Sequence, residues 1–255
     1  MNGHDERAYG AAVGSEYDVL YPASVPEFQT EATVALLSEL ASDGGSQGRI
    51  LEFGIGTGRI AIPLSRRGFE VVGIDGSAEI VQQLRAKQGA EDIHVVRGDF
   101  INTEVPGLFS LVVLALNTIF APSSRAAQIE CFRNAGRHLS SDGRFVIEAY
   151  VLRPEQLSGA WSIWPRLVGS ERVEMQVARY DLASNHVERT MIHLRPEGTR
   201  LIQVNDCYAW PGELDLMAQL AGFELEDRYG DWAKKAFSNS CDRHVSVYRL
   251  RNAST

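Results

Sequence analysis

The sequence predicts an α/β protein with a seven-stranded, mostly parallel sheet, helices on both faces, and an antiparallel β insert acting as a cap. Three observations lead to this fold class. Short apolar runs alternate with helical patterns between residues 49 and 151, as expected for a parallel sheet covered on both faces. Polar and apolar residues then alternate between residues 152 and 210, which is typical of antiparallel strands. The first pattern returns from residue 211 onward.

The composition is that of an ordinary globular protein. The chain has 255 residues, 44% hydrophobic and 23% charged, and its length fits one large domain with an insertion. The formal charge of −8 disfavours contact with phosphate backbones, so we expect no nucleic-acid partner. The longest apolar run, residues 111–116, is far shorter than the roughly 20 residues that span a bilayer, so we expect no membrane partner.

The cysteines and the first residues indicate the compartment. Cys131, Cys207 and Cys241 are widely spaced, odd in number and form no CxxC pair. We interpret them as reduced core thiols and expect neither a disulfide framework nor a metal site. The polar first residues lack the apolar stretch of a signal peptide. The sequence therefore predicts a cytoplasmic protein.

Residues 1–47 are expected to form an N-terminal helical cap. The start is rich in Gly and Ala, includes Tyr17, and is expected to be mobile. Pro26 favours the first turn of a helix, which carries apolar residues at four-residue spacing. Residues 42–47 are expected to link this helix to the core.

The core is expected over residues 48–151 and 211–255. Gly68 is typical of a residue that follows the end of a helix, and Ser77 of one that caps the start of the next. A further helix is expected over residues 211–221. The seven strands are expected at residues 50–53, 70–74, 94–97, 111–116, 144–151, 223–229 and 244–250.

Residues 152–210 are expected to form the insert. Three runs near residues 173–177, 187–194 and 200–208 resemble strands, and turn-forming residues separate them. Their alternation predicts a roughly three-stranded antiparallel sheet with one apolar face to bury.

A glycine-rich turn is the most informative segment. Gly54, Gly56 and Gly58 lie where the first strand turns into a helix. Gly54 allows a sharp turn, and Gly56 allows a ligand to approach the main chain. A tight turn also needs glycines without any ligand, so the motif alone is weak evidence. A dinucleotide-binding turn needs GxGxxG, but Arg59 stands where its third glycine would fall.

The segment from Glu52 to Gly58 reads ExGxGxG and resembles motif I of class I S-adenosylmethionine-dependent methyltransferases. Residues 48–151 match the core of that family, and residues 208–223 resemble its later helix and strand. The resemblance implies a Rossmann-like fold and S-adenosyl-L-methionine as cofactor. The cofactor-binding residues that it implies are Glu52, Gly54, Gly56, Gly58, Asp75, Asp99, Phe100 and Asn117.

Asp75 and Asp99 each have an expected role and an alternative. Asp75 ends the second strand, where its carboxylate can accept both ribose hydroxyls, and a plain turn residue is the alternative. Asp99 follows the third strand, where it can accept the adenine amino group beside Phe100, and a solvated loop acid is the alternative. All lie at successive strand ends, the edge at which open α/β sheets bind ligands.

The resemblance implies methyl transfer to the N, O or C atom of a small molecule. The insert is similar to that of small-molecule methyltransferases, so residues 152–210 are expected to form an acceptor lid for an aromatic or sugar-like acceptor. Asn117 is followed by Thr-Ile-Phe without the prolines of base amino-methyltransferases, which also argues against nucleic acid. The alternative is a non-catalytic cofactor-binding or regulatory protein, because fold does not imply function. A monomer or homodimer is expected.

Two residues are candidates for a role beside the transferred methyl group. Tyr17 could close over the sulfonium, since aromatic faces attract cations. His193 shares its alternation phase with Met191 and so could face the acceptor, although a structural histidine is the alternative. Trp164 of the insert is a further candidate for contact with the acceptor.

Overall fold

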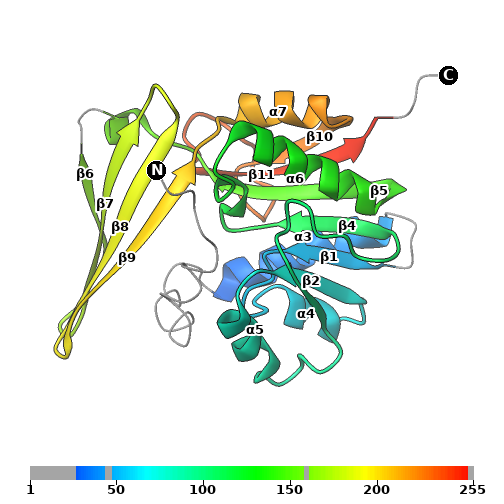
Figure 1. The fold of residues 1–255 in the computed structure, drawn as a ribbon, viewed down its shortest axis with the longest axis horizontal. Helices are drawn as coiled ribbons and strands as arrows, with labels where there is room; N and C mark the ends of the chain where they lie inside the picture. The colour runs from blue at the N-terminus through cyan, green and yellow to red at the C-terminus, as the bar shows by residue number, and fades with distance from the viewer. Residues whose placement is uncertain (1–26, 44–47, 158–160, 252–255) are drawn as a thin grey trace.

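The computed structural model describes residues 27–43, 48–157 and 161–251, which form a seven-stranded sheet and a separate four-stranded sheet (Figure 1). The larger sheet has the order β10-β11-β5-β4-β1-β2-β3, and the smaller one β6-β7-β8-β9. The strands of the larger sheet are β1 (Ile50–Phe53), β2 (Val71–Asp75), β3 (His94–Arg97), β4 (Phe109–Leu114), β5 (Leu139–Tyr150), β10 (Phe223–Tyr229) and β11 (Arg243–Leu250). This sheet confirms the predicted fold class.

The central strands are apolar because helices cover both of their faces. Every residue of β1 and β4 is buried. Strands β1 to β5 pair in parallel, and β11 pairs antiparallel with both β5 and β10. The carboxyl ends of β1, β2 and β4 therefore meet at one edge of the sheet.

Helices form a layer on each face of this sheet. One layer contains α3 (Glu27–Asp43), α4 (Ala61–Arg66) and α5 (Ala78–Arg85), whose buried side chains share one hydrophobic cluster. The other layer contains α6 (Arg125–His138) and α7 (Pro211–Leu220). Helix α3 packs on β4 and β5, and the predicted N-terminal helical cap stays a prediction. The rest of that predicted cap lies outside the described residues.

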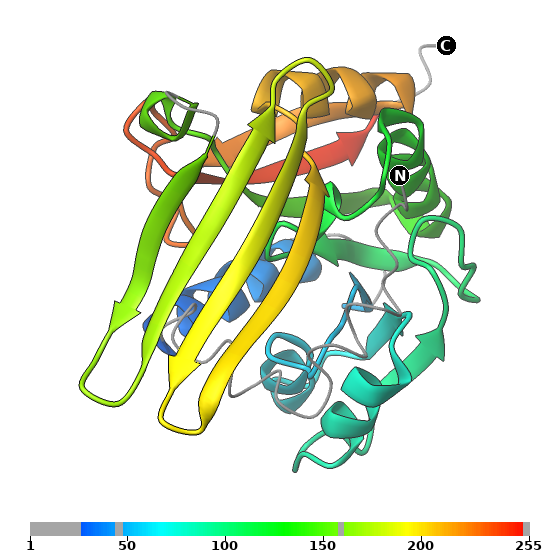
Figure 2. The same ribbon diagram turned by 60° about the vertical axis from the view of Figure 1, so that its left-hand side comes forward.

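The insert follows β5 and forms the second sheet, which stands beside the carboxyl edge of the first (Figure 2). Its strands are β6 (Ser162–Val168), β7 (Val173–Asp181), β8 (His186–Arg195) and β9 (Gly198–Cys207). The sequence predicted roughly three strands and missed β6, because Pro165 interrupts this strand and its residues do not alternate. Strand β6 accommodates the proline at the sheet edge, where a missing N–H costs no ladder bond.

In β7 the apolar residues are not the buried ones. Val173, Met175 and Val177 are only half-buried. Glu174 and Gln176, which alternate with them, are the buried residues. The face toward the core is therefore largely polar.

Two further findings concern the described residues. No helix among them is long and apolar enough to cross a membrane. Cys131, Cys207 and Cys241 are buried free thiols, as predicted.

Candidate functional site

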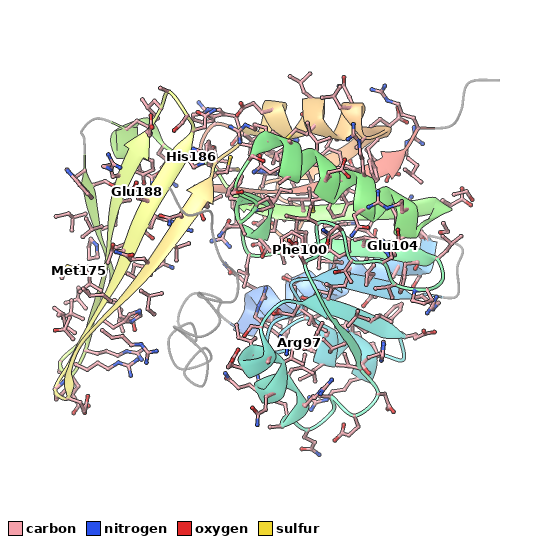
Figure 3. The ribbon with its side chains drawn as sticks, in the orientation of Figure 1. Arg97, Phe100, Glu104, Met175, His186 and Glu188 are labelled. Carbon is pink, nitrogen blue, oxygen red and sulfur yellow. The ribbon has the colours of Figure 1, made fainter. Side chains whose placement is uncertain are left out.

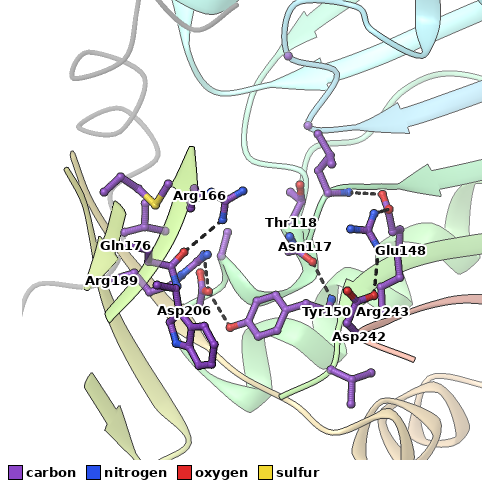
Figure 4. Close-up of a pocket in the computed structure, with 18 of the residues that line it drawn as sticks. Asn117, Thr118, Glu148, Tyr150, Arg166, Gln176, Arg189, Asp206, Asp242 and Arg243 are labelled. Atoms are coloured by element: carbon purple, nitrogen blue, oxygen red, sulfur yellow. Dashed lines mark hydrogen bonds and ion pairs between the residues drawn. The ribbon is translucent and has the colours of Figure 1, made fainter. Parts of the chain in front are cut away.

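A cavity of about 770 Å³ lies between the carboxyl edge of the large sheet and the inner face of the insert (Figure 4). The core contributes the turns after β1, β2 and β4 and the end of β5. The insert contributes alternate residues of all four strands. The lining residues used below are Gly54, Gly56, Asp75, Phe100, Asn117, Glu148, Tyr150, Trp164, Arg166, Gln176, Arg189, Met191 and Asp206.

The three glycines of the turn have different surroundings, although all have positive φ. A Cβ on Gly58 would lie 3.0 Å from Leu84 and 3.1 Å from Ile62, so this glycine permits close packing of α4 and α5. A Cβ on Gly56 would come no closer than 3.9 Å to any protein atom, the nearest being the carbonyl oxygen of Gly54. Gly56 therefore borders open space within the cavity, as a backbone that receives a ligand must.

Asp75 connects the end of β2 to the glycine turn. Its Oδ2 accepts a hydrogen bond from the Gly56 N–H at 2.9 Å, and its Oδ1 accepts one from the Ser77 N–H at 2.9 Å. Burial raises the pKa of this carboxyl, while these two N–H groups oppose the rise. A carboxylate has about four lone-pair directions, so Asp75 can accept two further hydrogen bonds from a ligand in the cavity.

Glu52 lies behind the glycine turn and does not line the cavity. Within the described part of the chain, its Oε2 is buried without a hydrogen bond, and so is Nη1 of Arg59. Burial raises the pKa of Glu52 to about 8, against the opposing attraction of Arg59. The predicted cofactor role of Glu52 stays a prediction.

Asp99, Phe100 and Asn117 lie near the same edge but differ in exposure. Asp99 is exposed and caps its own turn, its Oδ1 accepting from the Ile101 N–H at 2.9 Å. Phe100 lines the cavity and is buried in a stack on Phe53. Asn117 lines it with φ of 67°, and its Oδ1 accepts from the Tyr150 N–H at 2.7 Å. The cofactor role of each residue stays a prediction.

An ion pair between a buried carboxylate and a partly exposed arginine supports this turn. Oε2 of Glu148 on β5 accepts from the Leu116 N–H at 3.0 Å, and its Oε1 is 3.3 Å from Arg243 on β11. Leu116 and Asn117 both have positive φ, which is uncommon for such side chains. Glu148 therefore stabilises a strained turn at the cavity wall.

The opposite wall carries a polar cluster that the sequence analysis missed. The Tyr150 hydroxyl donates to Oδ2 of Asp206 at 3.0 Å, and Nη2 of Arg189 lies 2.5 Å from the same oxygen. The Arg189 guanidinium also lies over the Tyr150 ring. Burial, reinforced by the charge of Asp206, raises the pKa of Tyr150 well above its usual value. Asp206 could have been found only by recognising that the polar positions of β9 face inward.

The three candidates for contact with the transferred methyl group or the acceptor have different outcomes. Tyr17 lies outside the described residues. His193 shares the inner face with Met191, as expected, but it does not line the cavity. Its ring is almost fully buried, 3.6 Å from Glu174, and burial lowers its pKa. Trp164 does line the cavity.

The geometry defines an α/β protein with a cavity where its parallel strands end. Residues 50–143 match a family model described as a methyltransferase domain. The chain is 30% identical to the CcbJ methyltransferase of Streptomyces caelestis, with a TM-score of 0.89 over 97% of this chain and 100% of that one. The chain belongs to the class I S-adenosylmethionine-dependent methyltransferases, and its cofactor is S-adenosyl-L-methionine.

Two other proteins are similar to this chain, one in part of its sequence and one in its fold. The putative methyltransferase YqeM of Bacillus subtilis is 31% identical over 106 residues, which are 41% of this chain and 43% of that protein. The chain therefore matches less than half the length of this curated relative. CalS10, an amino pentose methyltransferase from Micromonospora echinaspora, has a TM-score of 0.70 at 17% identity, over 92% of this chain and 96% of that one.

Proposed function

We propose that this protein transfers a methyl group from S-adenosyl-L-methionine to a polar small molecule held between its two sheets. One observation carries the proposal. A single cavity is lined on one side by the glycine turn and Asp75 and on the other side by the Tyr150–Asp206–Arg189 cluster. A donor and an acceptor can therefore meet in one cavity, as in-line transfer requires.

The residues on the core side fit the cofactor. Gly56 leaves the space that a ligand needs, and Asp75 has acceptor capacity for two ribose hydroxyls. Phe100 lines the cavity next to them and offers an apolar contact to the adenine ring. When bound, the cofactor supplies an electrophilic methyl group on a sulfonium centre. The protein supplies alignment and exclusion of water.

The residues on the insert side favour a polar acceptor. Asp206, Arg189, Arg166 and Gln176 all line the cavity, and Arg166 lies 3.4 Å from Gln176 (Figure 4). Such a wall suits a ligand that carries hydroxyl or amino groups, because buried polar groups need partners. CalS10, which shares the fold, is named as acting on an amino pentose. Amino sugars are therefore the first acceptors to test.

The Tyr150–Asp206–Arg189 cluster orients the acceptor in this proposal. Because the pKa of Tyr150 is raised, its hydroxyl stays protonated at neutral pH and donates to Asp206. The hydrogen bond from Tyr150 and the ion pair with Arg189 both involve Oδ2 of Asp206. A carboxylate oxygen has two lone pairs, so Oδ1 can accept a hydrogen bond from the acceptor and fix its reacting atom.

Transfer of a labelled methyl group to D-glucosamine and other amino sugars tests the proposal. Asp206→Asn should lower kcat/KM for the acceptor about tenfold to a hundredfold, because a charge-assisted hydrogen bond is lost. The affinity for S-adenosylhomocysteine should stay unchanged. Asp181→Asn is the matched control, because Asp181 is an exposed insert carboxylate that binds Ser184 instead.

The remaining alternative is a regulatory protein that binds the cofactor without turnover. Cofactor binding without methyl transfer to any small molecule, including those that copurify with the protein, would favour that alternative. Equal loss of turnover in Asp206→Asn and Asp181→Asn would contradict the proposed acceptor site.

A further inference from the structure

The inner face of the insert sheet is the wall of the cavity that the acceptor would meet. In Figure 3, Met175 of β7 lies on the side of the insert away from the core, so Glu174 and Gln176 beside it face inward. Residues paired across antiparallel strands share a face. The strand register therefore places Arg189 and Arg200 on the inner face as well.

This inner face carries an excess of positive charge. Between residues 161 and 207 the chain has six arginines and six carboxylates, so the insert as a whole is neutral. The inner positions of its strands hold four of the arginines and two of the carboxylates, namely Arg166, Arg189, Arg195, Arg200, Glu174 and Asp206. A net positive wall thus faces the cavity of a chain whose formal charge is −8.

Arg166 stands where this wall meets the cavity. It lies at a shift of register between β6 and β7, and such irregularities change the direction of a side chain. Its Nη1 donates to Oε1 of Gln176 at 3.4 Å inside the cavity (Figure 4). This contact uses one of the five N–H donors of the guanidinium. Because a guanidinium can hold two oxygens of a carboxylate or phosphate at once, Arg166 suits an anionic ligand group.

The other arginines that line the cavity lie next to carboxylates. The pairs are Arg189–Asp206, Arg243–Glu148 and Arg153–Asp242, at 2.5, 3.3 and 3.7 Å. An anionic ligand group would compete with a carboxylate at each of these three arginines. At Arg166 it would displace the neutral amide of Gln176, which holds a guanidinium less strongly than a charged group does.

We infer that the acceptor carries an anionic group, a carboxylate or a phosphate, and that Arg166 binds this group. The inference rests on the proposed function, because it names the class of acceptor for the same cavity. Gln176 pairs with Met191, which is two residues along β8 from Arg189, or about 7 Å. A sugar phosphate is long enough to place an amino or hydroxyl group at Asp206 and its anionic group at Arg166.

The positive charges beyond the cavity favour the same ligand. Arg195 and Arg200 lie near His193 on the inner face, and burial together with their charges lowers the pKa of this histidine. Charges of one sign along a wall add to a common field, which attracts ligands of the opposite sign. An anionic acceptor is therefore drawn to the insert side of the cavity, opposite the cofactor side.

Calorimetry with matched probes tests the inference on the full chain saturated with S-adenosylhomocysteine. D-Glucosamine 6-phosphate should bind about tenfold or more tightly than D-glucosamine if the group is a phosphate, because charge-assisted hydrogen bonds are gained. D-Glucosaminic acid tests a carboxylate in the same way. If neither anionic probe binds more tightly than D-glucosamine, the inference is overturned.

Substitutions of Arg166 test whether this residue binds the anionic group. In Arg166→Gln the preference for the anionic probe should fall about tenfold, whereas Arg166→Lys should keep part of it. Arg179→Gln is the matched control, because Arg179 is an exposed arginine of the same insert that binds Glu188. The affinity for S-adenosylhomocysteine should stay unchanged in all three variants, and thermal unfolding checks that each is folded.

Two results with these variants would contradict the inference. A preference for the anionic probe that survives in Arg166→Gln would place the anion elsewhere in the cavity. A loss of affinity for S-adenosylhomocysteine in folded Arg166→Gln would assign Arg166 to the carboxylate of the cofactor. Either result overturns the inference.

Transfer of a labelled methyl group separates this inference from the proposed function. Equal kcat/KM for D-glucosamine and the anionic probes would support the proposed function and overturn the inference. Binding of an anionic probe through Arg166 without methyl transfer would leave the anion site in place and contradict the proposed function. Transfer that favours an anionic probe, and that loses this preference in Arg166→Gln, supports both.

Discussion

At the scale of single residues, Asp75 organises the cofactor side of the cavity. Its carboxylate receives N–H groups from the turn after β1 and from the residue that caps α5. Asp75 therefore does stabilise the turn, which was the alternative to its predicted role in binding the ribose. Its position on the cavity wall leaves room for the predicted second role toward the ribose.

Asp75→Ala is expected to reduce the affinity for S-adenosylhomocysteine about tenfold to a hundredfold. Charge-assisted hydrogen bonds to the ribose would be lost, at about 1.5–3 kcal/mol. Titration calorimetry measures the change. Asp92→Ala is the control, because Asp92 is an exposed carboxylate that does not line the cavity. Equal affinities in both variants would assign Asp75 to the turn alone.

Glu52 makes the free energy of unfolding depend on pH. Its pKa is about 8 when folded against 4.5 for an ordinary glutamate, so the folded protein keeps a proton that the unfolded chain releases. The stabilisation from this group is complete below pH 4.5 and is lost as the pH rises toward 8. Its contribution should decline by up to about 1.4 kcal/mol per pH unit over that window.

Glu52→Gln should remove this contribution while keeping the side-chain volume. Urea unfolding of both proteins at several pH values measures the difference between them. The free energy of unfolding of the wild-type protein, minus that of Glu52→Gln, should fall as the pH increases. A difference that stays constant with pH would show that Glu52 is ionised in the folded protein throughout.

At the scale of elements, the glycine turn combines a binding position and a packing position. Gly56→Ala should mainly weaken cofactor binding, because its Cβ would project into the cavity. Gly58→Ala should mainly lower the free energy of unfolding, because its Cβ would press on Ile62 and Leu84. Positive φ strains both variants by about 1 kcal/mol, so each serves as the control for the other. Identical effects on binding and stability would contradict this division.

The insert sheet supplies a second contrast, between Trp164 and His193. Trp164→Ala should lower acceptor turnover and leave cofactor affinity nearly unchanged, because Trp164 lines the insert side of the cavity. His193→Ala should instead lower stability, because the ring is buried beside Glu174. Steady-state kinetics and thermal unfolding of both variants separate the effects. An unaltered KM and kcat in Trp164→Ala would place the acceptor elsewhere.

At the scale of the whole molecule, the large sheet could be predicted from the sequence because its pattern is local. Each buried strand is a short apolar run, and each turn has its own glycine or cap. The glycine motif and Asp75 were found because they follow those strands directly. The position of Gly58 against α5 could not be foreseen, since it depends on how two helices pack.

The insert was harder to predict because alternation does not reveal which face is inside. In β7 the polar residue Gln176 lines the cavity, whereas Val173 and Met175 are only half-buried. The Tyr150–Asp206–Arg189 cluster joins β5, β8 and β9, whose residues are distant in sequence. No local pattern brings these three side chains together, and only the arrangement of the two sheets does so.

A crystal structure of the full chain with S-adenosylhomocysteine shows whether the cofactor lies in the cavity between the sheets with its sulfur toward the acceptor side. The ribose should contact Asp75, and the sulfur should face the inner face of the insert near Tyr150. A sulfur that points away from the insert, or a ligand bound outside this cavity, would contradict the account.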